Sequence, residues 1–189
     1  AVAPLIAARE APEAILAILP ADHQIGDADA FAACLAKAAE LAASAALIVT
    51  LGVRPTAPET GYGYILPGAP IAAAAAAFRI ERFVEKPDAA TAEGYLAGGR
   101  HLWNSGMFIA SSATLIAAFE AHAPEALAAA RAALDAAVVD LDFLRLAPEP
   151  TAACPEISFD YAVMERYANS AVIEADFHWS DLGSWQAIW

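Results

Sequence analysis

The fold is decided by residues 14–53, AILAILPADHQIGDADAFAACLAKAAELAASAALIVTLGV. Two apolar runs, 14–19 and 47–53, have the length and the lack of alternation that are typical of buried parallel strands. Between them, the alanine-rich stretch from about Asp29 to Ser44 predicts a long helix. Strand, helix and strand with short connections form a βαβ unit, so the sequence predicts an α/β domain built on a parallel sheet.

The rest of the chain predicts more elements of the same kinds. Prolines and glycines dominate residues 54–70, which indicates loops and turns around one small strand. Residues 72–77 show no periodicity and are expected to form a connection. We expect further strands at 62–66, 78–84, 101–110 and 171–175, and helices at 1–10, 89–97, 112–122, 124–138 and 159–165. The chain end at Trp189 resembles the first turn of another helix, and no internal repeat is present.

Composition narrows the class of protein. The chain has 189 residues, 59% of them hydrophobic, and a mean hydropathy of +0.47. Most of this excess is alanine, and no apolar run approaches the roughly 20 residues of a spanning helix, so we expect no membrane segment. A net charge of −13 repels phosphate backbones and argues against nucleic-acid polymers as partners. Cys34 and Cys154 lie in unlike contexts, which favours reduced thiols and a cytoplasmic location.

An acid and a base meet at a predicted strand end in Phe-Val-Glu-Lys-Pro-Asp, residues 83–88. Residues 78–84 alternate apolar and polar side chains, and Pro87 stops the strand. Glu85 and Lys86 therefore lie at the carboxyl end of a strand, where open α/β sheets bind ligands. A surface ion pair at a turn is the alternative. Asp88 is expected to cap the following helix.

Two carboxylates follow predicted strands in separate parts of the chain. Asp22 comes directly after the first apolar strand, and Asp181 lies between Trp179 and Gly183 in an aromatic segment. Carboxylates from two strand ends can hold one magnesium ion, which also takes water and phosphate oxygens as ligands. A turn or helix-capping role is the alternative for Asp22, and the one that an isolated aspartate favours. The sequence does not show that the two segments meet.

Three other segments carry polar groups suited to a ligand. Residues 59–64 form a loop punctuated by Gly61 and Gly63, where the backbone could approach a ligand and Tyr62 could lie against a sugar ring; a β-turn with exposed tyrosines is the alternative. Asn104 lies in an otherwise apolar strand, so its amide needs a partner in the backbone or a ligand. Asp160 lies in the first turn of a predicted helix, where it could simply favour the helix dipole.

Six motifs occur in a fixed order along the chain: Pro-Ala-Asp-His at 20–23, Pro-Glu-Thr-Gly-Tyr-Gly-Tyr-Ile at 58–65, Phe-Val-Glu-Lys-Pro at 83–87, Trp-Asn-Ser-Gly-Met-Phe at 103–108, Phe-Asp-Tyr-Ala-Val-Met-Glu at 159–165 and Trp-Ser-Asp-Leu-Gly-Ser-Trp at 179–185. Taken together, they resemble bacterial mannose-1-phosphate guanylyltransferases nearly from end to end. Glu-Lys-Pro and the strand-end aspartate are shared with sugar nucleotidyltransferases generally, whereas Pro-Ala-Asp-His, Trp-Asn-Ser-Gly and Trp-Ser-Asp look specific to the mannose branch.

The resemblance implies a fold, a reaction and a set of roles. The fold is a Rossmann-like mixed, mostly parallel sheet flanked by helices, and the reaction transfers a guanylyl group from GTP to mannose 1-phosphate. Asp22 and Asp181 would hold Mg²⁺, and Lys86 would neutralise the sugar phosphate. By the same resemblance, the sugar-binding residues would be Gly61, Tyr62, Glu85, Lys86 and Asn104, with Asp160 in a supporting role.

One motif of that family is missing from residues 1–189. The family opens with a loop of the type Gly-Gly-x-Gly-Thr-Arg-Leu, which binds the GTP phosphates, and no such stretch precedes Pro20. We therefore expect a partial nucleotidyltransferase domain that lacks the first strands and does not turn over GTP by itself. A transferase for another hexose 1-phosphate and a non-catalytic sugar-phosphate-binding subunit remain alternatives. The sequence does not fix the assembly, for which a homodimer is one candidate.

Overall fold

The chain forms two compact units in the computed structural model, which describes residues 1–11, 13–72 and 74–183. Unit 1 contains residues 1–14 and 111–167. Unit 2 contains residues 15–110 and the residues from 168 onward. The helix expected to begin at the end of the chain lies outside the described residues. That residues 1–189 form one domain stays a prediction.

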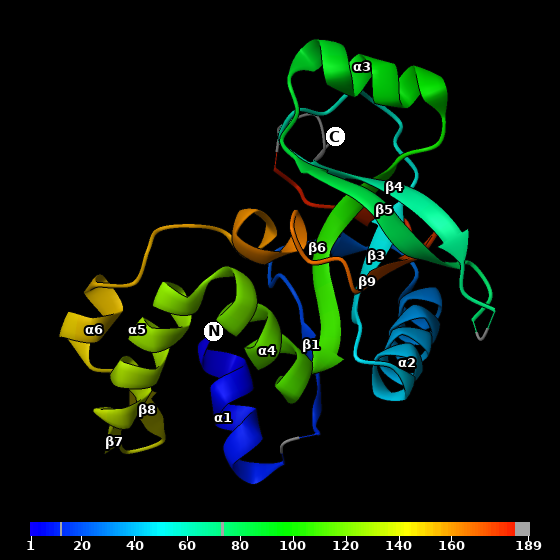
Figure 1. The fold of residues 1–189 in the computed structure, drawn as a ribbon. Helices are drawn as coiled ribbons and strands as arrows, with labels where there is room; N and C mark the ends of the chain where they lie inside the picture. Colours follow the sequence, from blue (N-terminus) through cyan, green and yellow to red (C-terminus); the bar gives the residue numbers. More distant parts are fainter. Residues whose placement is uncertain (12, 73, 184–189) are drawn as a thin grey trace. The chain divides into compact units, whose positions relative to one another are not determined.

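Unit 2 is built on a six-stranded sheet with the order β1-β6-β3-β9-β5-β4, and β6 also pairs with β4 (Figure 1). Among the described pairings, β3 and β9 are parallel, whereas β3–β6, β4–β5, β4–β6 and β5–β9 are antiparallel. The strands are β1 (Ile15–Ile18), β3 (Ile48–Val53), β4 (Gly63–Pro70), β5 (Ala77–Glu85), β6 (Leu102–Ser111) and β9 (Ser170–Glu174).

The predicted α/β class with a mixed sheet is confirmed, but the expectation of a mostly parallel sheet is wrong. The strands of the predicted βαβ unit, β1 and β3, are not neighbours, because β6 lies between them and runs antiparallel to β3. β1 is also less buried than its apolar sequence suggests: Ile18 is 38% exposed at the edge of the sheet. Local sequence predicts each strand, whereas the order depends on contacts between distant residues.

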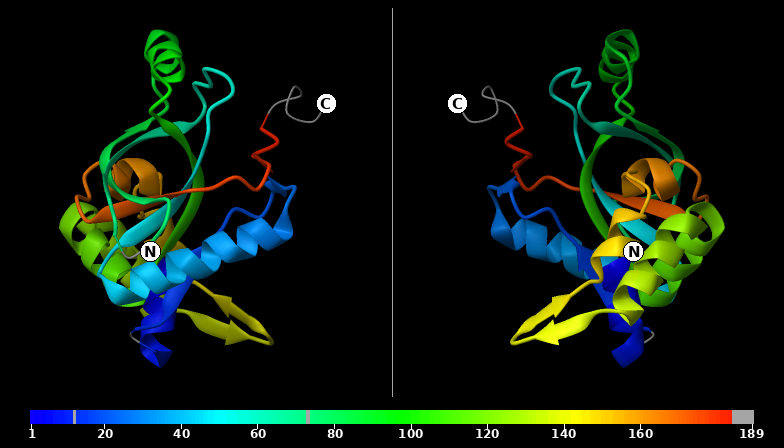
Figure 2. Two further views of the ribbon diagram at one scale, coloured as in Figure 1. Left: turned by 90° about the vertical axis from the view of Figure 1, so that its right-hand side faces the viewer. Right: turned by 90° about the vertical axis from the view of Figure 1, so that its left-hand side faces the viewer.

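The core of unit 2 lies between the sheet and α2 (Ala28–Ser44), which covers one face. Figure 2 shows α2 as a single straight helix. Its buried side chains are Ala38, Leu41 and Ala42, which pack in one hydrophobic cluster with Val49 and Leu51 of β3. Burial of apolar area at about 25 cal/mol per Å² is the main stabilising contribution of such a contact.

Asp27 caps α2, and its removal should destabilise the protein. Its side chain accepts a hydrogen bond of 2.9 Å from the Ala30 N–H, one of the amides that no helical carbonyl can satisfy. We expect Asp27→Ala to lower the free energy of unfolding by about 1 kcal/mol, measured by urea denaturation. Asp29→Ala, which alters the first turn without removing the cap, should cost clearly less; equal losses would contradict the capping role.

Two smaller features of unit 2 lie near the predicted site. Asp88 caps α3 (Ala89–Gly98), as expected, and Gly99 ends it in the left-handed conformation with φ of 63°. The two-residue strands β2 (Gln24–Ile25) and β10 (Trp179–Ser180) pair in antiparallel fashion, with Ser180 opposite Gln24. This pairing joins the two segments that carry Asp22 and Asp181.

Unit 1 consists of helices and one hairpin. α1 (Val2–Glu10), α4 (Ser112–His122) and α5 (Pro124–Asp135) contact one another. The helix predicted to reach residue 138 ends at Asp135, because β7 (Val138–Asp140) and β8 (Phe143–Arg145) form the hairpin shown in yellow in Figure 2. α6 (Pro148–Ala152) follows, and the predicted helix at 159–165 is a π-helical turn, η1 (Asp160–Met164).

The described residues contain no helix that is both long and apolar enough to cross a membrane. Both cysteines are free thiols, as the sequence predicted.

Candidate functional site

Two of the predicted site residues, Glu85 and Asn104, meet Gly63 at the paired ends of β4, β5 and β6. Gly63 is directly opposite Glu85 in the β4–β5 register, and Asn104 lies on the adjoining strand. A Cβ atom at Gly63 would lie only 2.5 Å from Glu85 Oε2 and 3.2 Å from Asn104 Cβ. The Glu85 carboxylate, the Asn104 side chain and the Gly63 backbone therefore lie against one another. We call this group of three residues the Gly63 wall.

Lys86 follows this wall in an unusual backbone conformation. Its φ is +47°, in the left-handed region that non-glycine residues seldom adopt, and a residue before proline normally prefers extended backbone. Its N–H donates a hydrogen bond of 3.2 Å to the Tyr62 carbonyl. The Lys86 side chain is 55% exposed, and Nζ lies 3.9 Å from Glu85 Oε1. Such strain persists only where the surroundings impose it, and it is frequent at functional sites.

Asp181 is held by two hydrogen bonds to one of its oxygens. The Tyr62 hydroxyl donates to Oδ1 at 2.5 Å, and the Gly183 N–H donates to the same atom at 3.0 Å. Burial, the hydrogen bond to Asp181 and the charge of that carboxylate raise the pKa of the Tyr62 phenol well above its usual range. The phenol is therefore a proton donor at neutral pH, and Asp181 is the acceptor.

The segment of Asp22 joins the same site through His23 and Trp179. The Trp179 Nε1–H donates to His23 Nδ1 at 3.0 Å, and the two rings meet edge to face. Since Ser180 pairs with Gln24, continuing the register by one residue brings His23 opposite Asp181. The structure thus places the Asp22 and Asp181 segments side by side, which the sequence left open.

The described residues contain no group of three or more His, Cys, Asp or Glu side chains that could hold a metal ion. A cation here would have Asp22 and Asp181 as its candidate protein ligands. That donor set suits Mg²⁺, which typically binds one or two carboxylates and completes its shell with water and phosphate oxygens.

A cavity of about 650 Å³ in unit 2 shares two aromatic residues with this site. Trp103 and Trp179 line the cavity, and both rings contact Tyr62, at centroid distances of 5.1 and 5.4 Å. The cavity also reaches Val53 and Glu174, at the carboxyl ends of the parallel strands β3 and β9. Ligands of open α/β sheets bind at such ends.

The structure adds Thr50, which sequence reasoning missed. Thr50 is fully buried on β3, and its hydroxyl donates a hydrogen bond of 2.9 Å to Asn104 Oδ1. The signal was present, because Thr50 is polar in an otherwise apolar strand. β6 bulges here, placing three residues opposite one of β3, with Gly106 at φ of 72°. The bond occupies the carbonyl side of the Asn104 amide and directs its N–H donors away from Thr50.

We expect Thr50→Val to weaken binding of any ligand that Asn104 contacts, because the amide loses its fixed orientation. The loss should be about 10-fold, the cost of one buried hydrogen bond left unsatisfied. Isothermal titration of the protein with mannose 1-phosphate, the acceptor that the sequence resemblance implies, would measure it. Thr50→Ser keeps the hydroxyl and should restore most of the affinity; an equal loss in both variants would show that packing, not the hydrogen bond, is responsible.

Gly61 and Asp160 are two further residues of the predicted site. A Cβ at Gly61 would have no atom within 4 Å, so the space beside Gly61 is open, whereas Gly63 lies tightly against Glu85. The approach of a ligand to Gly61 stays a prediction. Asp160 lies on η1 of unit 1, whereas the other predicted site residues belong to unit 2. The role of Asp160 stays a prediction.

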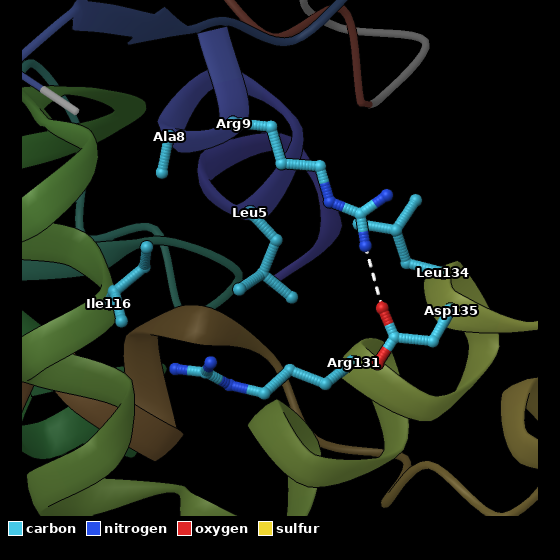
Figure 3. Close-up of a pocket in the computed structure, with 7 residues that line it drawn as sticks. All are labelled: Leu5, Ala8, Arg9, Ile116, Arg131, Leu134 and Asp135. Carbon is cyan, nitrogen blue, oxygen red and sulfur yellow. Dashed lines mark hydrogen bonds and ion pairs between the residues drawn. The ribbon is translucent and has the colours of Figure 1, made fainter. Parts of the chain in front are cut away.

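Unit 1 has a cavity of its own, of about 230 Å³, shown in Figure 3. Leu5, Ile116 and Leu134 give it an apolar lining, and Arg9 closes one side through a 2.6 Å ion pair with Asp135. Its second arginine, Arg131, is paired with Glu120. Because both cations already have carboxylate partners and none of the predicted site residues is present, unit 2 holds the better candidate site.

The chain is similar to known proteins over nearly its whole length. A family model described as nucleotidyl transferase matches residues 1–189. A mannose-1-phosphate guanylyltransferase of Sinorhizobium fredii is 46% identical over 98% of the chain, and one of Escherichia coli K12 is 44% identical over all of it. The chain spans only 36% and 40% of the lengths of these two relatives.

Solved structures give the same fold. A crystal structure described as a mannose-1-phosphate geranyltransferase from Thermus thermophilus matches with a TM-score of 0.82 and 38% identity, covering 97% of this chain and 51% of that one. A mannose-6-phosphate isomerase from Helicobacter pylori matches with a TM-score of 0.84 and 27% identity, covering 94% and 68%.

Proposed function

Because the chain belongs to the nucleotidyl transferase family, we propose that the full-length protein transfers a guanylyl group from GTP to mannose 1-phosphate, giving GDP-mannose and pyrophosphate. One observation carries this proposal: Tyr62 is hydrogen-bonded to both Asp181 and Lys86, and it directly precedes Gly63 of the Gly63 wall. Tyr62 therefore links the residues proposed to bind the sugar phosphate with the residue proposed to bind the cation. Relatives named for this activity cover the whole chain at 40–46% identity, which supports the choice of substrates.

The chemistry suits these residues. A phosphate oxygen of mannose 1-phosphate attacks the α-phosphorus of GTP, and the bond to the β-phosphate oxygen breaks as pyrophosphate leaves. The attacking phosphate is already ionised at neutral pH, so no general base is required. The protein must hold two anions together and stabilise charge on the phosphoryl oxygens. Lys86 supplies a cation for the sugar phosphate, and Glu85 with Asn104 offers an acceptor and donors for sugar hydroxyls.

Mg²⁺, when bound at Asp22 and Asp181, would neutralise phosphate charge and orient the phosphates. This role explains how a chain with net charge −13 can bind polyanions. We propose the cytoplasm as the location, and a homodimer remains a candidate assembly.

The test is magnesium-dependent release of pyrophosphate from GTP plus mannose 1-phosphate by the full-length protein. No release above background would reject the proposal. Equal release with glucose 1-phosphate or dTTP would favour a transferase for another hexose 1-phosphate, and binding of mannose 1-phosphate without any turnover would favour a non-catalytic subunit.

A further inference from the structure

We infer that Tyr62 is a positioning residue for Asp181, which selects the carboxylate oxygen available to a cation. This inference rests on the proposed function, and it differs from the sugar-stacking role that the loop sequence suggests for Tyr62. The two roles use different parts of the side chain: stacking uses the ring, whereas positioning uses the hydroxyl.

The hydrogen bonds of Asp181 distinguish its two oxygens. Tyr62 Oη and the Gly183 N–H both donate to Oδ1, at 2.5 and 3.0 Å. Two donors on one oxygen fix the rotation of the carboxylate and reduce the electron density that Oδ1 can offer. Oδ2 is therefore the better ligand for a cation. A Cβ at Gly183 would collide with Oδ2, so glycine at that position keeps this side of the carboxylate open.

The Tyr62 ring is itself fixed, which makes the hydroxyl a rigid donor. Its edge-to-face contacts with Trp103 and Trp179 have interplanar angles of 89° and 66°. The Trp179 ring is itself held in place by its hydrogen bond to His23. The Tyr62 carbonyl also accepts the Lys86 N–H at 3.2 Å, so one residue is hydrogen-bonded to both the proposed cation ligand and the proposed phosphate-binding lysine.

Groups that orient a metal ligand commonly change metal affinity by about 10-fold to 100-fold when removed. Tyr62→Phe removes only the hydroxyl and keeps the ring contacts with both tryptophans, so the fold should survive. We therefore expect the variant to bind the cation at least about 10-fold more weakly. The requirement for Mg²⁺ in turnover should rise in parallel, with the KM for mannose 1-phosphate nearly unchanged.

The experiment titrates Mn²⁺ into the full-length protein in the presence of GDP-mannose and follows free Mn²⁺ by electron paramagnetic resonance. Wild type, Tyr62→Phe, Asp181→Asn and the control Tyr95→Phe are compared. Tyr95 lies on α3 and stacks on His101, so its hydroxyl is outside the Tyr62–Asp181 pair. We expect Asp181→Asn to lose most binding, Tyr62→Phe to be weakened and Tyr95→Phe to match wild type.

Each outcome separates the positioning role from the proposed function. Equal Mn²⁺ affinity in Tyr62→Phe and wild type overturns the positioning role even if guanylyl transfer is demonstrated. Wild-type binding that does not depend on Asp181 also overturns it. Weaker Mn²⁺ binding by Tyr62→Phe supports it even in a protein that fails the pyrophosphate assay, in which case only the proposed reaction falls.

Discussion

Lys86→Ala should lower kcat/KM for mannose 1-phosphate by about 100-fold to 1,000-fold, the range found when a preorganised group that stabilises developing charge is removed. The physical reason is the location of the cation. Lys86 follows Glu85 at the end of β5, its backbone is held in the left-handed region, and its ammonium is exposed toward solvent rather than tightly paired. An ion pair at 3.9 Å with Glu85 is loose enough for the lysine to exchange its partner for a phosphate.

The chain offers a matched control for this substitution. Its other lysine, Lys37, lies on α2 and lines a separate cavity with Glu40 and Ser44. Lys37→Ala removes the same charge without touching the site, so its kcat/KM should remain within about 2-fold of wild type. The measurement is the initial rate of pyrophosphate release at varied mannose 1-phosphate. An unchanged rate for Lys86→Ala would assign Lys86 to a surface ion pair at a turn, the alternative that its sequence allowed.

Lys86→Arg separates charge from geometry. Arginine keeps the positive charge but carries a wider, planar group with a different reach. If simple neutralisation of the phosphate is what matters, this variant should recover a large part of the activity lost in Lys86→Ala. A loss as large as that of Lys86→Ala would indicate that the point charge must occupy one position.

The sequence predicts the elements of this fold better than their arrangement. The strand at residues 47–53 and the cap at Asp88 depend on local patterns, and both are present. The antiparallel insertion of β6 between β1 and β3 depends on pairs more than 50 residues apart, such as Val49 with Ile109. Periodicity carries no information about such pairs, so the mixed sheet was predicted but the balance of its pairings was not.

The same division applies to the site. The sequence marks five residues of the site, either because they lie at a strand end or because they are polar in an apolar segment: Asp22, Glu85, Lys86, Asn104 and Asp181. The family resemblance then assigns them to one site. The hydrogen bonds that orient them do not follow, because Tyr62 with Asp181 and Thr50 with Asn104 join residues 119 and 54 positions apart. Geometry also selects between glycines: Gly61 and Gly63 are equivalent in a loop pattern, but only Gly63 faces a carboxylate at short range.

Gly63→Ala should therefore lower activity by about 100-fold, the cost of displacing reacting or binding groups by roughly 1 Å. A methyl group at residue 63 would lie 2.5 Å from Glu85 Oε2 and 3.3 Å from the ring of Phe83, distances at which something must move. Glu85 is only 10% exposed at its side chain and is confined by its pairing with β4, so its carboxylate has little room to retreat. We expect the displaced carboxylate to lose its sugar contact, which raises the KM for mannose 1-phosphate.

Gly61→Ala is the matched control, because it makes the same chemical change two residues earlier, in the loop that leads into β4. No atom lies within 4 Å of the added methyl group there, so activity and KM should stay within about 2-fold of wild type. Urea denaturation of both variants would show whether Gly63→Ala still folds; a folded variant with reduced affinity places the effect in the site. If Gly61→Ala is the damaging substitution instead, the ligand itself must fill the open space beside Gly61, and the role that the family resemblance gave that residue is correct.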